Sequence, residues 1–583
     1  MTDPVILLLV LPLGGAAAAL AAKLPGIDRR PALVRALTLV TPVVLLGGAV
    51  ALGFGYAAAS AGRVATYTLG GWPVPVGIGL KLDGLAWLSS VLVFGLSFLI
   101  SLYAVAHREY GPEFYFFFML LVAGMEGVVL TTDVFNMFVS FEIIAISAYV
   151  LIAYHREGTA LVASFKYLVL SSVGIFFFLF GVFVIYRELG TLAFADITSL
   201  YAAIEDPVRL RTLRLALVAL VVGIGVRTAF IPFHTWLPEA HAYAPHPISA
   251  LLSGVLIKVS FFAMVRIITV FSPGMFAHLL LWIGAVTAIV AVVWALSQRD
   301  AKKLLAYHSI SQMGYVLAAL GAAGGATAAI TVSGGPAGAA AAADAGGTLA
   351  LSAAVYHALN HALFKSLLFL SVGTAVHLTG ERNLYRMPRL GRRAPLLAVL
   401  FGVGALSIAG VPGFNGYASK VAISTALAGS PAYMLLNLTA IGTAASFIKL
   451  SRVFRPGARD SEGERAPAQA RERILPPGAT VGMSLIALLC VTVGLAPRTA
   501  LGLLQGLLAP GSGLATMSPA FAPAKLLDTA ILLALGFVVY RLTQTEIGGR
   551  IAHRIEEHAP GLRTVLLFFL VGVVGFALAA TVA

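Results

Sequence analysis

The chain has 583 residues, of which 59% are hydrophobic and only 11% are charged, and its formal net charge is +14. A soluble protein is about 25% charged, so this composition excludes a chain that faces water on all sides and indicates a membrane protein. Nucleic acid does not explain the positive charge, because the basic residues stand in short clusters between apolar runs. The one cysteine, Cys490, excludes an intrachain disulfide and a cysteine-ligated metal held by this chain alone, and we expect no cofactor.

Long apolar runs follow one another along the whole chain. A window of about 20 residues finds about 16 of them. Each must be helical, because lipid cannot satisfy the hydrogen bonds of an open backbone. The chain is therefore predicted to be an all-α polytopic membrane protein. The runs begin near Val5, Val34, Leu85, Phe114, Val134, Leu161, Leu213, Pro247, Phe276, Leu304, Leu349, Pro395, Tyr433, Val481, Leu526 and Val565.

The basic residues are distributed unequally between alternate loops. If the N-terminus is outside, most of them fall in the cytoplasmic loops, as the positive-inside rule requires. The first segment lacks the basic start of a cleaved signal, so we expect it to remain as the first helix. We predict a multi-pass protein of the inner (cytoplasmic) membrane with its N-terminus outside. The residues interpreted as topology anchors are Lys302, Lys303, Arg386, Arg389, Arg392 and Arg393.

Three segments are not expected to cross the membrane. The stretch 455–477 is charged and predicts a cytoplasmic loop, and the Gly/Ala-rich stretch 321–347 predicts an external loop. The stretch 543–558 has isoleucines every four residues opposite mixed charges. This pattern predicts a short amphipathic helix in the membrane interface.

An internal repeat divides the middle of the chain. The ten residues from Phe165 match the ten from Phe364 at six positions, and Ile257-Lys-Val-Ser matches Ile448-Lys-Leu-Ser. Between these matches each half has an apolar run broken by proline, at Pro232 and at Pro412. Such repeats are typical of transporters with ion sites near the midplane, and an odd count of about five helices per repeat requires the second to be inverted. The predicted units are N-terminal helices (1–110), a first repeat (111–272), a second repeat (273–456), a loop (457–477) and C-terminal helices with the amphipathic helix (478–583).

Ionisable residues inside the apolar runs are the candidates for chemistry, because such groups must face protein, water or a partner. A lysine in apolar surroundings can load and release a proton, and histidines can link such sites. In the first half these residues are Glu142, Lys166, Arg227, His234, Glu239, His241 and Lys258. In the second half they are His308, His357, His361, Lys365, Lys420 and Lys449.

Structural roles compete with function at several of these positions. Lys166 can snorkel from a helix end, and His234 and His241 stand beside prolines where a capping role is equally expected. Glu126 is either a functional carboxylate or a residue that faces a partner subunit. Glu142, Lys258 and Lys420 favour function, because each lies in a helix or a break away from the loop charges.

Four motifs resemble one known superfamily. It comprises the antiporter-like subunits of proton-pumping complex I, subunits of Mrp-type Na+/H+ antiporters, and membrane subunits of energy-converting hydrogenases. The motifs are Arg227 to Lys258, containing Phe-His-Thr-Trp-Leu-Pro-Glu-Ala-His, Asp133 to Glu142, Asp300 to Tyr315, and Gly410 to Lys420.

The resemblance implies two inverted five-helix repeats and a charged axis across the membrane. In that pattern Glu142 matches the glutamate of the fifth helix and pairs with residue 227. Charge then passes to Lys258, the lysine of the eighth helix, and through His308 and the following histidines to Lys420. The C-terminal helices resemble a shortened form of the lateral helix of one complex I subunit.

The chain departs from the family pattern at three of these positions. Arg227 replaces a lysine, keeping the charge but not readily releasing a proton, so it suits a fixed counter-charge to Glu142. His308 stands where a small hydroxyl residue is expected, which adds a relay site. Lys420 stands where one subgroup has glutamate.

Three functions are carried forward. The first is a proton-translocating subunit of a redox-driven pump that is complex I-like or hydrogenase-like. The second is a subunit of an Mrp-type Na+/H+ antiporter, with Na+ as a transported ion, and the third is a membrane anchor or ion channel subunit for a soluble partner enzyme. The sequence contains no dinucleotide fingerprint and no cysteine cluster, so redox chemistry would belong to partner subunits.

Overall fold

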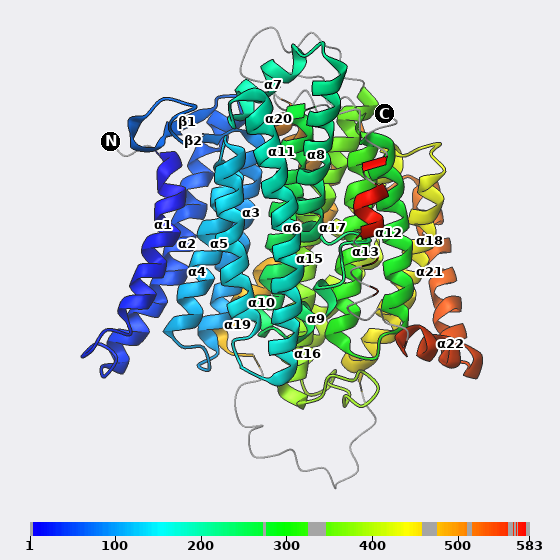
Figure 1. The fold of residues 1–583 in the computed structure, drawn as a ribbon. Coiled ribbons are helices and arrows are strands. Elements are labelled where there is room, and N and C mark those ends of the chain that lie inside the picture. Colours follow the sequence, from blue (N-terminus) through cyan, green and yellow to red (C-terminus); the bar gives the residue numbers. More distant parts are fainter. Residues whose placement is uncertain are drawn as a thin grey trace.

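The computed structural model describes residues 4–271, 276–324, 345–456, 475–509 and 516–557, together with parts of 564–578. These residues form a bundle of helices that run roughly side by side (Figure 1). The predicted external loop, 321–347, and the predicted cytoplasmic loop, 457–477, fall mainly outside the described residues.

The described part of the first half contains a small hairpin and eleven α-helices. Its elements are α1 (Pro4–Ala21), α2 (Pro31–Ser60), β1 (Ala65–Thr68), η1 (Leu69–Gly71), β2 (Gly79–Leu82), α3 (Gly84–Ala106), α4 (Pro112–Leu130), α5 (Val134–Ile152), α6 (Gly158–Leu189), α7 (Phe194–Ala202), α8 (Pro207–Thr228), α9 (Leu237–Tyr243), α10 (His246–Leu251), η2 (Leu252–Leu256) and α11 (Ile257–Phe271).

The described part of the second half is helical. Its elements are α12 (Ala277–Ser297), α13 (Ala301–Ala322), α15 (Ala345–Thr379), α16 (Pro395–Ala409), α17 (Asn415–Ala426), α18 (Ala432–Leu450), η5 (Ser451–Phe454), α19 (Pro477–Leu495), α20 (Pro497–Leu508), α21 (Pro523–Thr543) and α22 (Glu546–Glu557).

The helices confirm a multi-pass membrane protein. Among the described residues, 11 helices are long and apolar enough to cross a membrane, and α1 and α16 are shorter apolar helices. A helix begins within a few residues of each predicted run as far as Leu526. Proline stands in the first turn of many of these helices, where its missing N–H costs no intrahelical bond.

The expectation of an all-helical chain is wrong between Ala65 and Leu82. Strands β1 and β2 pair antiparallel there, with Ala65 opposite Leu82 and Thr68 opposite Gly79. The segment lies outside the apolar spans, so the lipid constraint on open strands does not apply to it. Figure 1 places β1, β2 and α7 at one end of the bundle, the hairpin face, and α22 at the other, the α22 face.

Both helices predicted to be broken are interrupted in the structure. In the first half α8 ends at Thr228, Ala229 adopts a φ of 58°, and the chain resumes as α9 only at Leu237. In the second half α16 ends at Ala409, and α17 begins after a turn in which Gly410 has a φ of 81°. A Cβ at Gly410 would lie 3.2 Å from Cδ of Lys420, so glycine also leaves room for that side chain.

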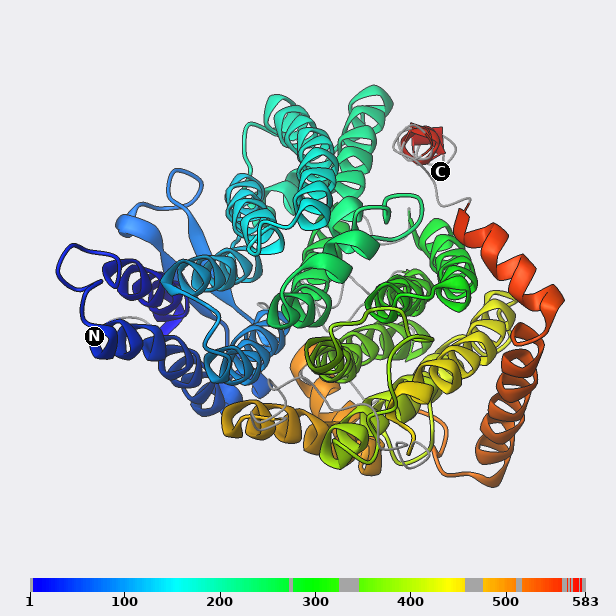
Figure 2. The same cartoon turned by 90° about the horizontal axis from the view of Figure 1, so that it is seen from below.

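The chain ends in an arm that wraps around the bundle. This C-terminal arm consists of α21, α22 and the described residues of 564–578. Helix α21 packs along α18, and α22 lies along α12 on the α22 face, where Arg299 and Glu556 approach to 3.6 Å. The last described residues stand apart from α21 (Figure 2), and Gly572 packs against the turn at Pro232. The segment predicted to be amphipathic forms α22, with Ile547 and Ile551 exposed.

Candidate functional site

Three lysines from different helices point into the interior of the bundle. Lys258 on α11 and Lys365 on α15 are fully buried, and Lys420 on α17 is partly buried. Each donates to a main-chain oxygen: Lys258 to Ser253, Lys365 to Leu305, and Lys420 to Ile408 at 2.7 Å. Within the described residues, none of the three forms an ion pair with a carboxylate.

The acceptor for Lys258 lies in a locally widened turn of its helix. Residues Leu252–Leu256 form a π-helical turn, in which the N–H of Ile257 donates to the oxygen of Leu252, five residues earlier. The oxygen of Ser253 is thereby released from the ordinary ladder and accepts from the Lys258 ammonium. The hydroxyl of Ser253 lies 2.8 Å from that of Ser309 on α13, which ties the turn to the second half.

Buried histidines lie between these lysines. His357 on α15 is held through both ring nitrogens, by Ser419 at 2.9 Å and by Gln312 at 3.2 Å. Its ring stacks with that of His361, one turn further on, at a centroid distance of 6.4 Å. The ring nitrogens of His308 and His361 have no hydrogen-bond partner among the described residues. Buried polar atoms require partners, so these positions fit an interior that admits water.

Electrostatic reach connects the lysines and histidines into one row. Lys258 and Lys365 act on His361, and Lys420 and Lys258 act on His357. His308 is influenced by Lys365, Lys420 and, more weakly, Lys449. The row therefore passes from α11 in the first half, through α15, to the broken helix of the second half.

Glu142 and Arg227 form the predicted pair. An Nη atom of Arg227 lies 3.5 Å from Oε1 of Glu142, and the guanidinium also stands 4.8 Å from the centre of the Phe141 ring. The Arg227 side chain is 2% exposed, whereas Glu142 is 40% exposed. Arg227 is thus enclosed in the protein, while its carboxylate partner reaches the outer surface of the bundle.

A second ion pair in the first half is not predicted by the sequence. Lys166 on α6 donates to both carboxylate oxygens of Glu239 on α9, at 2.9 and 2.7 Å. Both residues are predicted interior charges, but their partnership depends on the fold of the broken helix. Lys166 is therefore held by a carboxylate, and snorkelling to the surface is not needed to explain it.

Two of the secondary candidates, His234 and Lys449, make contacts that explain them as structural residues. His234 stacks on Trp294 at 5.2 Å, and Lys449 donates at 2.7 Å to the oxygens of Leu296 and Gln298, where α12 ends. A lysine that satisfies terminal carbonyls stabilises a helix end. His241 is different, because it is fully buried and lies within electrostatic reach of Lys365 and Lys258.

Two other charged residues, Lys302 and Glu126, lie in the interior, contrary to what the sequence suggested. Lys302, expected to be a surface anchor, is buried and donates to the oxygen of Ala244 at 2.7 Å. It faces inward because α13 packs against α9, and the oxygen of Ala244 at the end of α9 accepts its ammonium. Glu126 is also fully buried and accepts from Ser90 at 2.7 Å, so the alternative that it faces a partner subunit is wrong.

The hairpin face carries one strong ion pair just before α3. Asp83 caps that helix by accepting from the N–H of Ala86, and it receives two hydrogen bonds from Arg266, one of them at 2.6 Å. Burial alone would raise the pKa of Asp83, but the Arg266 guanidinium, helped by Lys81, lowers it to about 2. This pair ties the start of α3 to α11, the helix of Lys258.

This fold and interior define a class: polytopic membrane proteins with broken helices and a row of ionisable groups along their core. The chain belongs to the NADH:quinone oxidoreductase/Mrp antiporter family, whose transmembrane sequence model matches residues 131–333 and 338–448. The matched region contains every residue weighed as a site candidate except Glu126 and Lys449.

Two curated relatives illustrate the membership. The chain is 33% identical over 450 residues to NADH-quinone oxidoreductase subunit N of Desulforudis audaxviator, a match that covers 75% of this chain and 83% of the relative. It is 31% identical over 429 residues to a Na+/H+ antiporter subunit of Alkalihalophilus pseudofirmus, covering 72% and 81%.

Solved structures have the same fold. A chain of the membrane-bound sulfane sulfur reductase, an archaeal respiratory membrane complex, superimposes with a TM-score of 0.72 at 27% identity, over 91% of this chain and 99% of that one. A chain of the Mrp complex from Dietzia sp. DQ12-45-1b superimposes with a TM-score of 0.71 at 23% identity, over 92% and 100%.

Proposed function

We propose that this chain is a proton-translocating membrane subunit of a multisubunit redox-driven pump, complex I-like or membrane-bound hydrogenase-like. The observation that carries the proposal is the row of Lys258, Lys365 and Lys420, which are joined by buried histidines and are held by main-chain oxygens. Amines without a carboxylate partner can exist in both protonation states, which a permanently paired lysine cannot readily do. No cofactor is assigned to this chain.

The residues have separate roles in this proposal. Lys258 and Lys420 take up and release the proton, and His308, His357 and His361 relay it between them. Lys365 and His241 set the charge around the relay. Arg227 is a permanent counter-charge to Glu142, and the pair changes the field at Lys258 without carrying the proton itself.

The exposure of Glu142 supports a multisubunit assembly. A carboxylate that is 40% exposed within a predicted span would face lipid in an isolated chain, at a high free-energy cost. A neighbouring membrane subunit that covers α5 would remove this cost and place its own charge near the Glu142–Arg227 pair. Redox subunits complete the assembly in the first hypothesis.

The topology belongs to the same proposal. We infer about 16 spans with two inverted five-helix repeats, at 111–272 and 273–456, between N-terminal and C-terminal helices. The interrupted helices α8–α9 and α16–α17, at matching places in the two halves, support this division. The N-terminus and hairpin face lie outside the inner membrane, which leaves most basic loops on the cytoplasmic α22 face.

A second candidate function is a subunit of an Mrp-type Na+/H+ antiporter, favoured by the relative from Alkalihalophilus pseudofirmus. A third, the anchor of a soluble enzyme, gives no role to the lysine row. Mild-detergent purification followed by mass spectrometry separates them. Iron-sulfur or quinone-reactive partners support the pump, whereas small membrane subunits alone support the antiporter.

Substitution of the lysines tests translocation itself. Lys258→Met and Lys420→Met should each abolish proton transport in vesicles, while the assembled complex is still recovered at normal yield. Lys303→Met is a matched control, because Lys303 packs over the Tyr243 ring outside the row. Wild-type transport in both methionine variants would contradict the proposed mechanism.

A further inference from the structure

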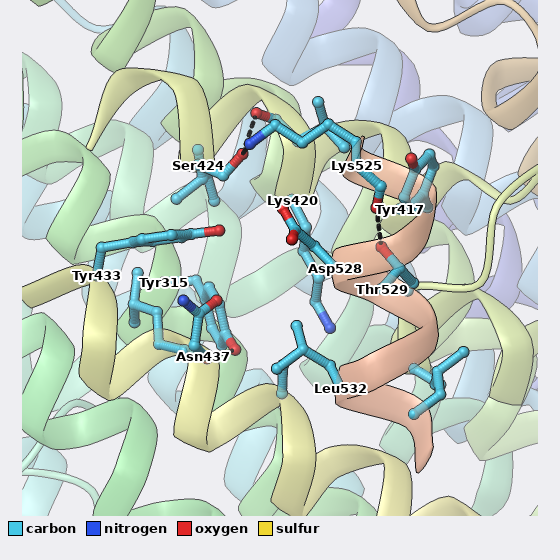
Figure 3. Close-up of a pocket in the computed structure, with 17 residues that line it drawn as sticks. Tyr315, Tyr417, Lys420, Ser424, Tyr433, Asn437, Lys525, Asp528, Thr529 and Leu532 are labelled. Carbon is cyan, nitrogen blue, oxygen red and sulfur yellow. Dashed lines mark hydrogen bonds between the residues drawn. The ribbon is translucent and has the colours of Figure 1, made fainter. Parts of the chain in front are cut away.

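A cavity of about 70 Å³ lies between α17, α18 and the C-terminal arm. Lys420 of α17 and Asp528 of α21 both line it (Figure 3). A cavity needs roughly 10–15 Å³ per water molecule, so this one is large enough for several. Its wall is polar as well as apolar, with Ser424, Tyr433 and Asn437 among the residues that line it.

The cavity extends from Lys420 toward the hairpin face. Ser424 lies close to the end of α17, Tyr433 close to the start of α18, and Lys525 in the first turn of α21. At a rise of about 1.5 Å per residue, Lys420 lies roughly 9 Å below the end of α17 and Asp528 roughly 8 Å below the start of α21. The two side chains therefore stand at similar depths below the same face.

Asp528 is the carboxylate of this cavity. It acts electrostatically on Tyr417 and Tyr433, and Lys525 is turned aside toward the Ser424 hydroxyl at 3.4 Å. Asp528 is exposed, and the window of α21 that could span the membrane is only 6% buried. A carboxylate at this depth is favourable only beside water or other polar groups, which the cavity provides.

We propose that this cavity is a water-filled proton port for Lys420, with Asp528 as the group that exchanges protons between the lysine and the outer water. The proposal rests on the proposed function, because it assumes that Lys420 carries the transported proton. It assigns a role to α21, which lies beyond the last residue, 448, matched by the family.

The transfer is a simple proton exchange. An N–H bond of the Lys420 ammonium breaks, and the proton passes directly or through a water molecule to the Asp528 carboxylate. This leaves a neutral amine and a carboxylic acid, which releases the proton to outer water; uptake follows the reverse steps. The titratable groups around the exchange are Lys420, Lys525, Asp528, Tyr315, Tyr417 and Tyr433. Two amines against one carboxylate disfavour a bound Na+, so the port suits a proton.

Cysteine labelling tests whether water reaches the cavity, independently of transport. In the assembled complex, with Cys490 replaced by serine, Thr529→Cys should react with a membrane-impermeant charged thiol reagent at least about tenfold faster than Leu535→Cys, because a thiol facing lipid meets no charged reagent. Thr529 lines the cavity, whereas Leu535 is an exposed apolar residue on the same helix. Equal reaction rates at the two positions would overturn the proposal.

Transport measurements test the carboxylate. Asp528→Asn should slow proton transport by about tenfold or more, because a proton-exchanging group is lost, and Asp528→Glu should restore most of the rate. Glu546→Gln removes a carboxylate from the same arm outside the cavity and should leave the rate unchanged. A wild-type rate in Asp528→Asn overturns the port. A slow Asp528→Asn beside an active Lys420→Met supports Asp528 and overturns the role of Lys420.

Discussion

The ammonium of Lys258 donates to the main-chain oxygen of Ser253, which lies in the π-turn between Leu252 and Leu256. An ordinary α-helix would commit that oxygen to the N–H of Ile257. The candidate proton carrier of the first half and the backbone irregularity beside it therefore form one unit. Anything that disturbs the π-turn is expected to act on Lys258.

Gly254 offers a way to disturb this turn. A Cβ at that position would clash with the Ser366 hydroxyl of α15, so Gly254→Ala must displace that side chain and crowd the contact between the two helices. We expect a loss of roughly 1–3 kcal/mol in stability from overpacking and a slower proton flux. Thermal unfolding in detergent and flux in vesicles measure the two effects. The matched control is Gly53→Ala, where a Cβ meets open space.

Arg227→Lys should keep transport, because lysine retains the positive charge opposite Glu142. Arg227→Gln should reduce it strongly, since a neutral side chain leaves the Glu142 carboxylate without its counter-charge. The proton flux of the two variants in vesicles measures whether the positive charge at position 227 is what transport requires. Equal loss in both would show that the guanidinium shape at Phe141, and not its charge, is what transport requires.

Lys449→Met is expected to affect stability rather than transport. The variant leaves two oxygens at the end of α12 without their donor, which should cost about 1–3 kcal/mol. Thermal unfolding should register this loss, while the flux per folded complex stays near the wild-type value. A selective loss of flux with unchanged unfolding would instead place Lys449 on the proton path.

Asp83→Asn should destabilise the hairpin face by roughly 3 kcal/mol, because it leaves the largely buried Arg266 without its carboxylate. The pKa of Asp83 is lowered from 3.8 to about 2, so the stabilisation is complete above pH 3.8 and is lost as the pH falls through 2. The difference in unfolding temperature between the variant and the wild type should therefore be constant from pH 5 to pH 8. A difference that grows between pH 5 and pH 8 would contradict this assignment.

The positions of the helices could be predicted from the sequence because lipid leaves the backbone few alternatives. Apolar runs, prolines at helix starts and the breaks near Pro232 and Pro412 all act locally. The Glu142–Arg227 pair could also be predicted, through the resemblance of two motifs to a known family. The hairpin between Ala65 and Leu82 could not, because it lies outside the membrane constraint.

The features that the sequence does not predict depend on contacts between distant segments. The Lys166–Glu239 pair forms only when α9 folds back beside α6, and the inward position of Lys302 depends on the carbonyl of Ala244. Asp528 looks like an ordinary polar residue near a helix start until α21 packs along α18. An interior charge can be recognised from hydropathy, whereas its partner requires the fold.

The C-terminal arm lies against both helix interruptions, the one after Thr228 and the one after Ala409. At one end α21 walls the cavity of Lys420, next to the turn at Gly410, and at the other Gly572 packs against the turn at Pro232. A single premature stop before Pro523 would therefore remove both contacts at once. The cavity of Lys420 would lose the wall that α21 forms, and the turn at Pro232 would lose its cover. Truncated proteins of this kind should therefore be impaired at both helix interruptions, although they keep Lys258, Lys365 and Lys420.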